Sequence, residues 1–188
     1  MRKLLIILMS ALLLVGCQNN TANQQVENKE FVNAVEVTTL PFDTAEYPFF
    51  KDGVDMAIEK ISYEDTMRML DEGGTSIVIF GYAGCGYCQR ALPVLNDAAL
   101  NKGVKAYYCD IVAEELSDEE FANLTTHLES ILKVENGEPV MYVPEVIAIK
   151  NGEIVGHKLS FDCAGNELTQ EERDNLQVIY EGLIEKLY

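Results

Sequence analysis

Hydrophobic positions along residues 54–188 alternate between two patterns. Unbroken Val and Ile runs predict strands buried on both faces, and apolar residues three or four apart predict amphipathic helices. Strands are expected at 54–61, 76–80, 104–112, 145–150 and 153–159. Helices are expected to follow Ser62, Cys88, Ser117 and Thr169.

Several residues mark where these elements begin and end. Ser62 is followed three residues later by Asp65, and Thr169 by Glu172, which is the spacing of a capping box. The dipeptide 151–152 is Asn-Gly, which favours a two-residue hairpin turn. Pro93 falls inside the second helix and is expected to kink it.

The order of elements predicts an α/β fold. Three strand–helix units precede a hairpin and a last helix, so the early strands should pair in parallel and the hairpin should add an antiparallel edge. The segment is long enough for one domain with its own core. No internal repeat is visible in the sequence.

The N-terminus differs in character from the rest. Arg2 and Lys3 precede an apolar run over 4–15, which is the layout of a signal peptide and too short for a comfortable membrane span. The run ends in Leu-Val-Gly-Cys at 14–17, which resembles the lipobox of bacterial lipoproteins. That resemblance implies cleavage after residue 16 and a lipid (palmitate) on Cys17, which would hold the protein on the outer face of a bacterial membrane. An ordinary signal peptide or a short anchor is the alternative.

Two further segments precede the domain. Residues 17–30 are rich in Asn, Gln, Thr and Glu and are expected to be a flexible tether. Residues 31–53 carry Phe42, Tyr47, Phe49 and Phe50, which the core pattern does not explain. This N-terminal extension is expected either to pack on the domain or to form part of a client surface.

The chain is strongly acidic. Its formal net charge is −17, and removal of Arg2 and Lys3 with the signal peptide takes it to −19. This charge argues against nucleic acid or anionic lipid as a partner of the folded surface. Solubility is one reading of the acidity, and a basic client is the other.

The candidate chemistry lies in Cys85-Gly86-Tyr87-Cys88, between the 76–80 strand and a helix. At a helix start both sulfurs would lie near free backbone N–H groups and the positive end of the helix dipole. A thiolate at Cys85 should be stabilised there, so we expect an exposed nucleophile at Cys85 and a resolving thiol at Cys88. The alternative is a structural Cys85–Cys88 disulfide that takes no part in turnover.

A metal site is not expected. Zinc would need a second close cysteine pair or histidines at ligand spacing, whereas Cys109, Cys163, His127 and His157 are scattered singly.

With a prolyl strand start at Val143-Pro144, the chain over 54–188 resembles the thioredoxin superfamily. The resemblance implies a thioredoxin-like central mixed sheet with flanking helices and a C-terminal hairpin plus helix. It also implies a cis Pro144 facing the cysteines and an active-site groove of Gly86, Tyr87, Val143 and Pro144. The implied activity is that of a thiol-disulfide oxidoreductase with no cofactor beyond the Cys85–Cys88 disulfide.

A narrower resemblance is to bacterial thioredoxin-like lipoproteins, including those associated with bacteriocin export. The implied clients are cysteine-containing exported proteins, with an unidentified redox partner.

Two departures from the cytoplasmic members of the superfamily bear on the direction of electron flow between this protein and its clients. Those members carry a buried Asp where this chain has Ile79, and Trp where it has Gly84. Val before the proline, here Val143, is found in some extracytoplasmic oxidases. Together these features favour disulfide formation or isomerisation over reduction. A non-catalytic binding or accessory module on the same scaffold is the alternative function.

Cys109 lies near the end of the expected 104–112 strand, and Cys163 follows the last expected strand. A structural Cys109–Cys163 disulfide, two separate thiols and a second redox pair all stay open from the sequence.

Overall fold

The computed structural model describes residues 35–188. The expected signal peptide, the lipid attachment at Cys17 and the 17–30 tether therefore lie outside the described residues. Within the described part, no helix is long and apolar enough to cross a membrane.

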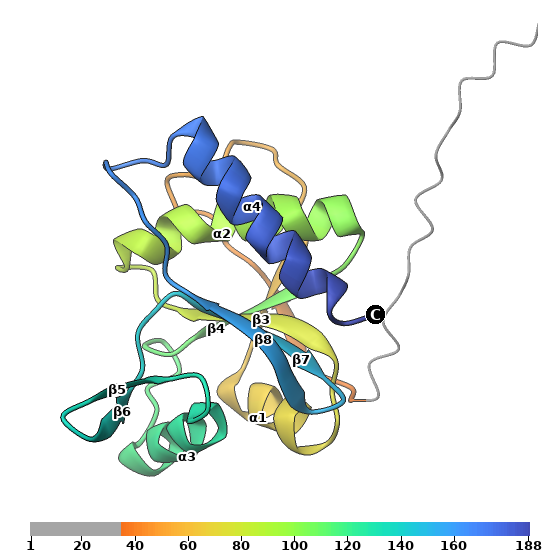
Figure 1. The fold of residues 1–188 in the computed structure, drawn as a ribbon. Coiled ribbons are helices and arrows are strands. Elements are labelled where there is room, and N and C mark those ends of the chain that lie inside the picture. The colour runs from red at the N-terminus through yellow and green to blue at the C-terminus, as the bar shows by residue number, and fades with distance from the viewer. Residues whose placement is uncertain (1–34) are drawn as a thin grey trace, which may run out of the picture.

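A six-stranded mixed sheet forms the centre of the domain, in the order β1-β2-β4-β3-β7-β8 (Figure 1). Strands β2, β4 and β3 pair in parallel, whereas β1, β7 and β8 join antiparallel. The strands are β1 Thr39–Pro41, β2 Ile58–Ile61, β3 Ser76–Gly81, β4 Ala106–Asp110, β7 Glu145–Lys150 and β8 Glu153–Leu159.

Four helices cover the two faces of this sheet. Helices α2 (Gly86–Lys102) and α4 (Gln170–Glu185) lie on one face, and α1 (Tyr63–Asp71) and α3 (Asp118–Leu128) lie on the other (Figure 1). Each face has its own apolar core, which contains Leu92, Leu95 and Tyr180 on the first side and Met69, Phe80 and Leu124 on the second. The expected α/β class, with a central mixed sheet and a C-terminal hairpin plus helix, is confirmed.

The local signals at the ends of elements are also confirmed. The side chains of Ser62 and Thr169 accept the backbone N–H groups of Asp65 and Glu172, and Glu172 closes a full capping box. The β7–β8 turn places Asn151 and Gly152 at φ 52° and 81°. A Cβ at residue 152 would lie 2.6 Å from the carbonyl oxygen of Leu70, so only glycine fits there.

Two strand pairs were not expected from the sequence. Strand β1 extends the sheet on the outer side of β2, and a separate hairpin, β5 (Lys133–Glu135) and β6 (Glu138–Val140), follows α3. The helix expected after Ser117 is α3, and it ends at Leu128, where the chain turns into this hairpin. Helix α2 continues through Pro93 as one 17-residue helix.

The described part of the N-terminal extension belongs to the same folded unit as the rest. Phe42 and Tyr47 are buried in the core beneath α2 and α4. The Tyr47 hydroxyl donates to the Tyr108 hydroxyl over 2.7 Å, and Tyr108 in turn donates to Asp110 over 3.1 Å. The extension was expected either to pack on the domain or to form part of a client surface, and residues 35–53 pack on the domain.

Candidate active site

The cysteine pair follows the C-terminal end of the central strand β3. All six of its residues are buried, and the chain then turns through 82–84 before α2 begins. The backbone N–H of Cys85 donates to the carbonyl of Tyr82 over 3.1 Å, which closes this turn. Cys85 is therefore the N-cap residue of α2, and Cys88 lies in its first turn.

The Cys85 sulfur occupies the place of a capping oxygen. The backbone N–H of Cys88 lies 3.1 Å from the Cys85 sulfur and donates to it. A hydrogen bond from the Cys88 thiol, and then backbone N–H groups and the nearby Arg90, lower the pKa of Cys85 to about 6, although burial opposes the shift. Cys85 is therefore largely a thiolate at neutral pH, which is the nucleophilic form.

Cys88 has the opposite protonation state. Its hydrogen bond to Cys85 and its burial raise its pKa well above the ordinary thiol value. The side chain has no exposed surface. A Cβ at Gly81 would lie 3.0 Å from the Cys88 sulfur, so the small residue at the end of β3 makes room for this thiol.

One expectation about Cys85 is wrong. We expected an exposed nucleophile, but Cys85 is only 8% exposed. The reason is that the Cys85 sulfur lies 3.7 Å from the Val143 carbonyl, which covers it from the strand side.

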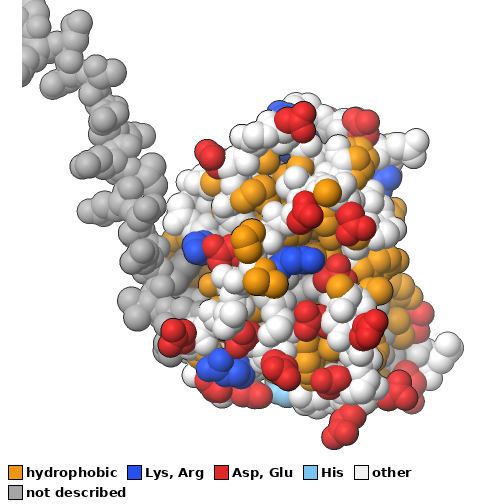
Figure 2. Space-filling view, turned by 180° about the vertical axis from the view of Figure 1, so that it is seen from behind, with side chains coloured by type: hydrophobic (Ala, Val, Ile, Leu, Met, Phe, Trp, Pro, Cys, Tyr) orange, Lys and Arg blue, Asp and Glu red, His pale blue; other side chains and the backbone are white. Residues whose placement is uncertain are grey.

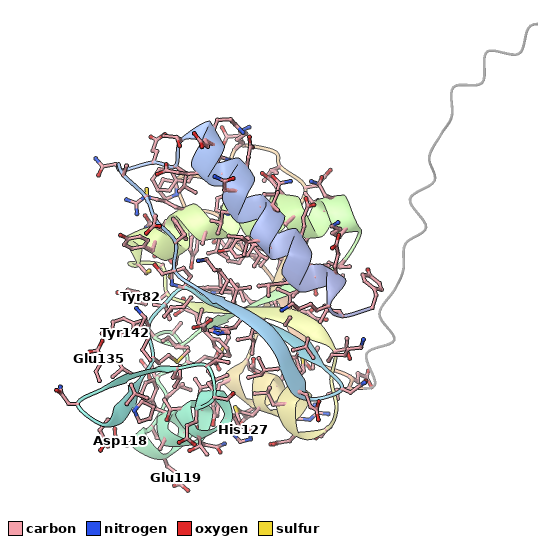
Figure 3. The ribbon with its side chains drawn as sticks, in the orientation of Figure 1. Tyr82, Asp118, Glu119, His127, Glu135 and Tyr142 are labelled. Carbon is pink, nitrogen blue, oxygen red and sulfur yellow. The ribbon has the colours of Figure 1, made fainter. Side chains whose placement is uncertain are left out.

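Of the groove residues implied by the superfamily resemblance, Val143 lies against the Cys85 sulfur through its carbonyl. The Val143–Pro144 peptide bond is cis, and Pro144 is buried at the start of β7. Tyr87 is 43% exposed and packs edge-on against Phe161, with ring centroids 5.5 Å apart. Tyr82 and Tyr142 lie along the same edge of the molecule (Figure 3).

Arg90 connects the start of α2 to two neighbouring segments. Its guanidinium donates to the Gly86 carbonyl over 3.0 Å and, through Nε, to the carbonyl of Asn166 over 2.5 Å. It also lies over the rings of Phe49 and Tyr87, 6.0 and 5.5 Å from their centroids. Arg90 was not a candidate from the sequence, although its place in the first turns of α2 is visible there.

The other two cysteines are not brought together. Cys109 is buried in the core beneath α1 and α3, and burial raises its pKa to about 12. Cys163 lies in the loop after β8, where its thiol donates to the carbonyls of Gly165 and Glu167. Both are free thiols. The structure thus has two separate thiols in place of a Cys109–Cys163 disulfide, because the two side chains belong to different sides of the fold.

A buried acid directly after Pro144 was also missed. Glu145 has no exposed surface, and its Oε2 has no hydrogen-bond partner among the described residues. Its Oε1 lies 3.0 Å from Nδ1 of His157 on β8. Burial raises the pKa of Glu145 to about 7. The only sequence signal was a lone acid directly before the four apolar residues 146–149.

Thiol chemistry is what this arrangement can perform. Within residues 35–188, no group of three His, Cys, Asp or Glu side chains could hold a metal ion. His127 contacts Asn123 and Asp71, and His157 contacts Glu145, so each makes local hydrogen bonds. Thiol–disulfide exchange proceeds by attack of a thiolate on a disulfide sulfur, and the lowered pKa of Cys85 favours that thiolate.

Comparisons with known proteins give similarities in fold. No family model matches the sequence, and no curated protein matches it. Thioredoxin O2 of Arabidopsis thaliana is 19% identical, with 71% of this chain and 96% of that chain covered and a TM-score of 0.44. Thioredoxin O1 of the same plant is 20% identical, with coverages of 70% and 97% and a TM-score of 0.43. The thioredoxin of Plasmodium falciparum is 18% identical, with coverages of 63% and 91% and a TM-score of 0.36.

The state of Cys85 predicts a specific pH profile of alkylation. Reaction of the reduced protein with iodoacetamide should rise with pH around a midpoint near 6, because only the thiolate reacts. In Cys88→Ala the midpoint should move up towards about 8.5, the free thiol value, since the largest stabilising hydrogen bond is lost. Cys88→Ser keeps a donor and should stay closer to the wild type. Equal midpoints in the Ala variant and the wild type would contradict this account.

Glu145 predicts a pH dependence of stability. The pKa of Glu145 is raised in the folded state, so the folded protein favours the protonated carboxyl. The contribution of Glu145 to the free energy of unfolding is therefore complete below about pH 4.5 and is lost as pH rises through about 7. Glu145→Gln should remove this decrease in stability with pH, because glutamine does not ionise. The free energy of unfolding in urea, wild type minus variant, should therefore fall by about 3 kcal/mol between these pH values. A difference that stays constant with pH would argue against a neutral Glu145.

Proposed function

We propose that this protein is a thiol-disulfide oxidoreductase that acts on cysteines of exported proteins through Cys85 and Cys88. The observation that carries the proposal is the contrast between the two sulfurs. Cys85 caps α2, where the hydrogen bond from Cys88 and backbone N–H groups lower its pKa, and Cys88 is fully buried beside it with a raised pKa. An inert structural pair has no need of such a difference.

In the oxidising direction the cycle starts from a Cys85–Cys88 disulfide. A client thiolate attacks the Cys85 sulfur, and Cys88 leaves and takes up a proton. A second client thiolate then attacks the client sulfur of the mixed disulfide, so that Cys85 leaves as a stabilised thiolate. The client loses two electrons and the protein gains them. A redox partner of the disulfide class has to reoxidise the pair.

The low pKa of Cys85 supports this direction. A stabilised thiolate favours the reduced form of the pair, which makes its disulfide a stronger oxidant. Ile79 in place of a buried acid, and Val143 before Pro144, favour the same direction. Isomerisation uses the same thiolate, whereas general reduction would call for a pair with a lower potential.

The proposal includes an extracytoplasmic, lipid-anchored location. Its support is the sequence of the first residues, in which a short apolar run ends in Leu-Val-Gly-Cys at 14–17. Such a compartment permits disulfides in client proteins. The lipid on Cys17 would leave Cys85 and Cys88 as the reacting pair.

Cysteine variants test the enzymatic reading against a binding module. Cys85→Ser should abolish oxidation of a reduced model protein whose native form contains disulfides, because the variant cannot form the Cys85–Cys88 disulfide and Cys88 alone is fully buried. Cys88→Ala should accumulate mixed disulfides at Cys85, which non-reducing electrophoresis and mass spectrometry would detect. Cys163→Ser is the matched control and should keep full activity. Full activity of Cys85→Ser would reject the enzymatic reading.

The reduction potential tests the direction of electron flow. Equilibration with glutathione should place the Cys85–Cys88 pair above about −230 mV, because the Cys85 thiolate is stabilised. Thioredoxin has a potential of about −270 mV, and a value near it would reject the oxidising direction.

A further inference from the structure

The β5–β6 hairpin forms an exposed surface next to the reacting sulfur. We call residues 133–142, which comprise this hairpin and the two residues after it, the hairpin surface. Strands β5 and β6 pair only with each other among the described residues, so neither is part of the central sheet. Tyr142, which contacts Lys133 and Glu135 on one face of the hairpin, is 41% exposed.

A short chain of contacts joins this surface to Cys85. The Tyr142 hydroxyl donates to Oε1 of Glu135 over 2.7 Å. The next residue, Val143, has the carbonyl that lies 3.7 Å from the Cys85 sulfur. Figure 3 shows Glu135 and Tyr142 on the same side of the molecule as Tyr82, which precedes the cysteines. The hairpin surface is therefore a direct continuation of the groove wall.

The charge around this surface is one-sided. Residues 114–138 contain eight carboxylates and a single Lys or Arg, Lys133. The Lys133 ammonium lies 5.5 Å from the centre of the Tyr142 ring. Asp118 and Glu119 on α3 extend the acidic region below the hairpin (Figure 3). Helix α3 and the hairpin lie at the lower right of the face shown in Figure 2. This part of the face displays Asp and Glu without Lys or Arg.

Acids elsewhere in the described chain are more often neutralised. Lys and Arg form ion pairs with Glu59, Asp65, Glu72, Asp97, Glu181 and Glu185. None of these carboxylates lies in 114–138. The negative charge of that region is therefore available to attract a positively charged ligand. Charges of one sign along a groove raise the local concentration of an oppositely charged ligand.

We propose that the hairpin surface binds the Lys- and Arg-rich segments that flank the reacting cysteines of client polypeptides. This rests on the proposed function, since it names the client class of the same site. Tyr142 supplies apolar contact, Glu135 and its cross-strand partner Glu138 supply charge, and Cys85 lies at the end of the bound segment. Electrostatic attraction of this kind acts mainly on the rate of association and weakens with salt.

Peptide binding tests the surface independently of catalysis. The probes are two extended peptides with Ser in place of Cys, identical except that one carries Lys and the other Glu beside the Ser. Calorimetry with the full chain should show tighter binding of the Lys peptide at about 0.02 M salt, with the preference largely lost at about 0.5 M. In Glu135→Lys/Glu138→Lys the affinity for the Lys peptide should fall about tenfold.

Two controls separate charge from structure. Glu153→Lys/Asp174→Lys changes the net charge by the same amount on other elements and should keep the wild-type preference. Tyr142→Phe removes the hydrogen bond to Glu135 without changing charge and should keep the salt dependence. Equal affinity for both peptides in the wild type, or an unchanged preference in the hairpin variant, would overturn the proposal.

Turnover of the cysteine-containing versions distinguishes this inference from the proposed function. Charge-dependent binding without turnover would leave the surface in place and reject the enzyme. Turnover of both peptides at equal rates, with equal affinity, would keep the enzyme and reject the surface.

Discussion

The burial of β3 on both faces is the constraint on which the rest of the structure depends. Because all six residues of this strand are covered, helices must pack on each side of the sheet, and they do so through two separate cores. The strand can then end only at the edge, where Gly81 leaves room for the Cys88 sulfur and Cys85 begins α2. The reactivity of Cys85 thus follows from its position as a helix cap at the end of a buried strand.

Most of the central architecture could be predicted from the sequence, because it rests on local patterns. The Val and Ile runs, the capping residues Ser62 and Thr169 and the Asn151-Gly152 turn each specify their element without long-range information. The β5–β6 hairpin carries the same Asn-Gly signal at Asn136 and Gly137, whose φ values are 52° and 90°. Its strands are exposed and only three residues long, so no run of buried residues accompanied that signal.

The cysteine pair at a helix start could be predicted from its local pattern, and the cis Pro144 from the superfamily resemblance, whereas the surroundings of the site could not be predicted. The cover over Cys85, the buried state of Glu145 and the separation of Cys109 from Cys163 depend on which distant segments meet in space. Glu145 illustrates the difficulty. In the sequence it is one acid among 31 acidic side chains, and only its position under the packed sheet makes it unusual.

Strand β1 also protects the sheet. It pairs with β2 through residues 39–41, and the chain that follows inserts Phe42 and Tyr47 into the core. Without this segment, β2 would present unpaired N–H and C=O groups at the edge of a sheet that lies over an open core. Uncovered edges of this kind are templates for pairing between copies of a chain. Strand β1 takes over as the edge, and its length of three residues and its Pro41, which has no N–H group, make it a poor template for such pairing.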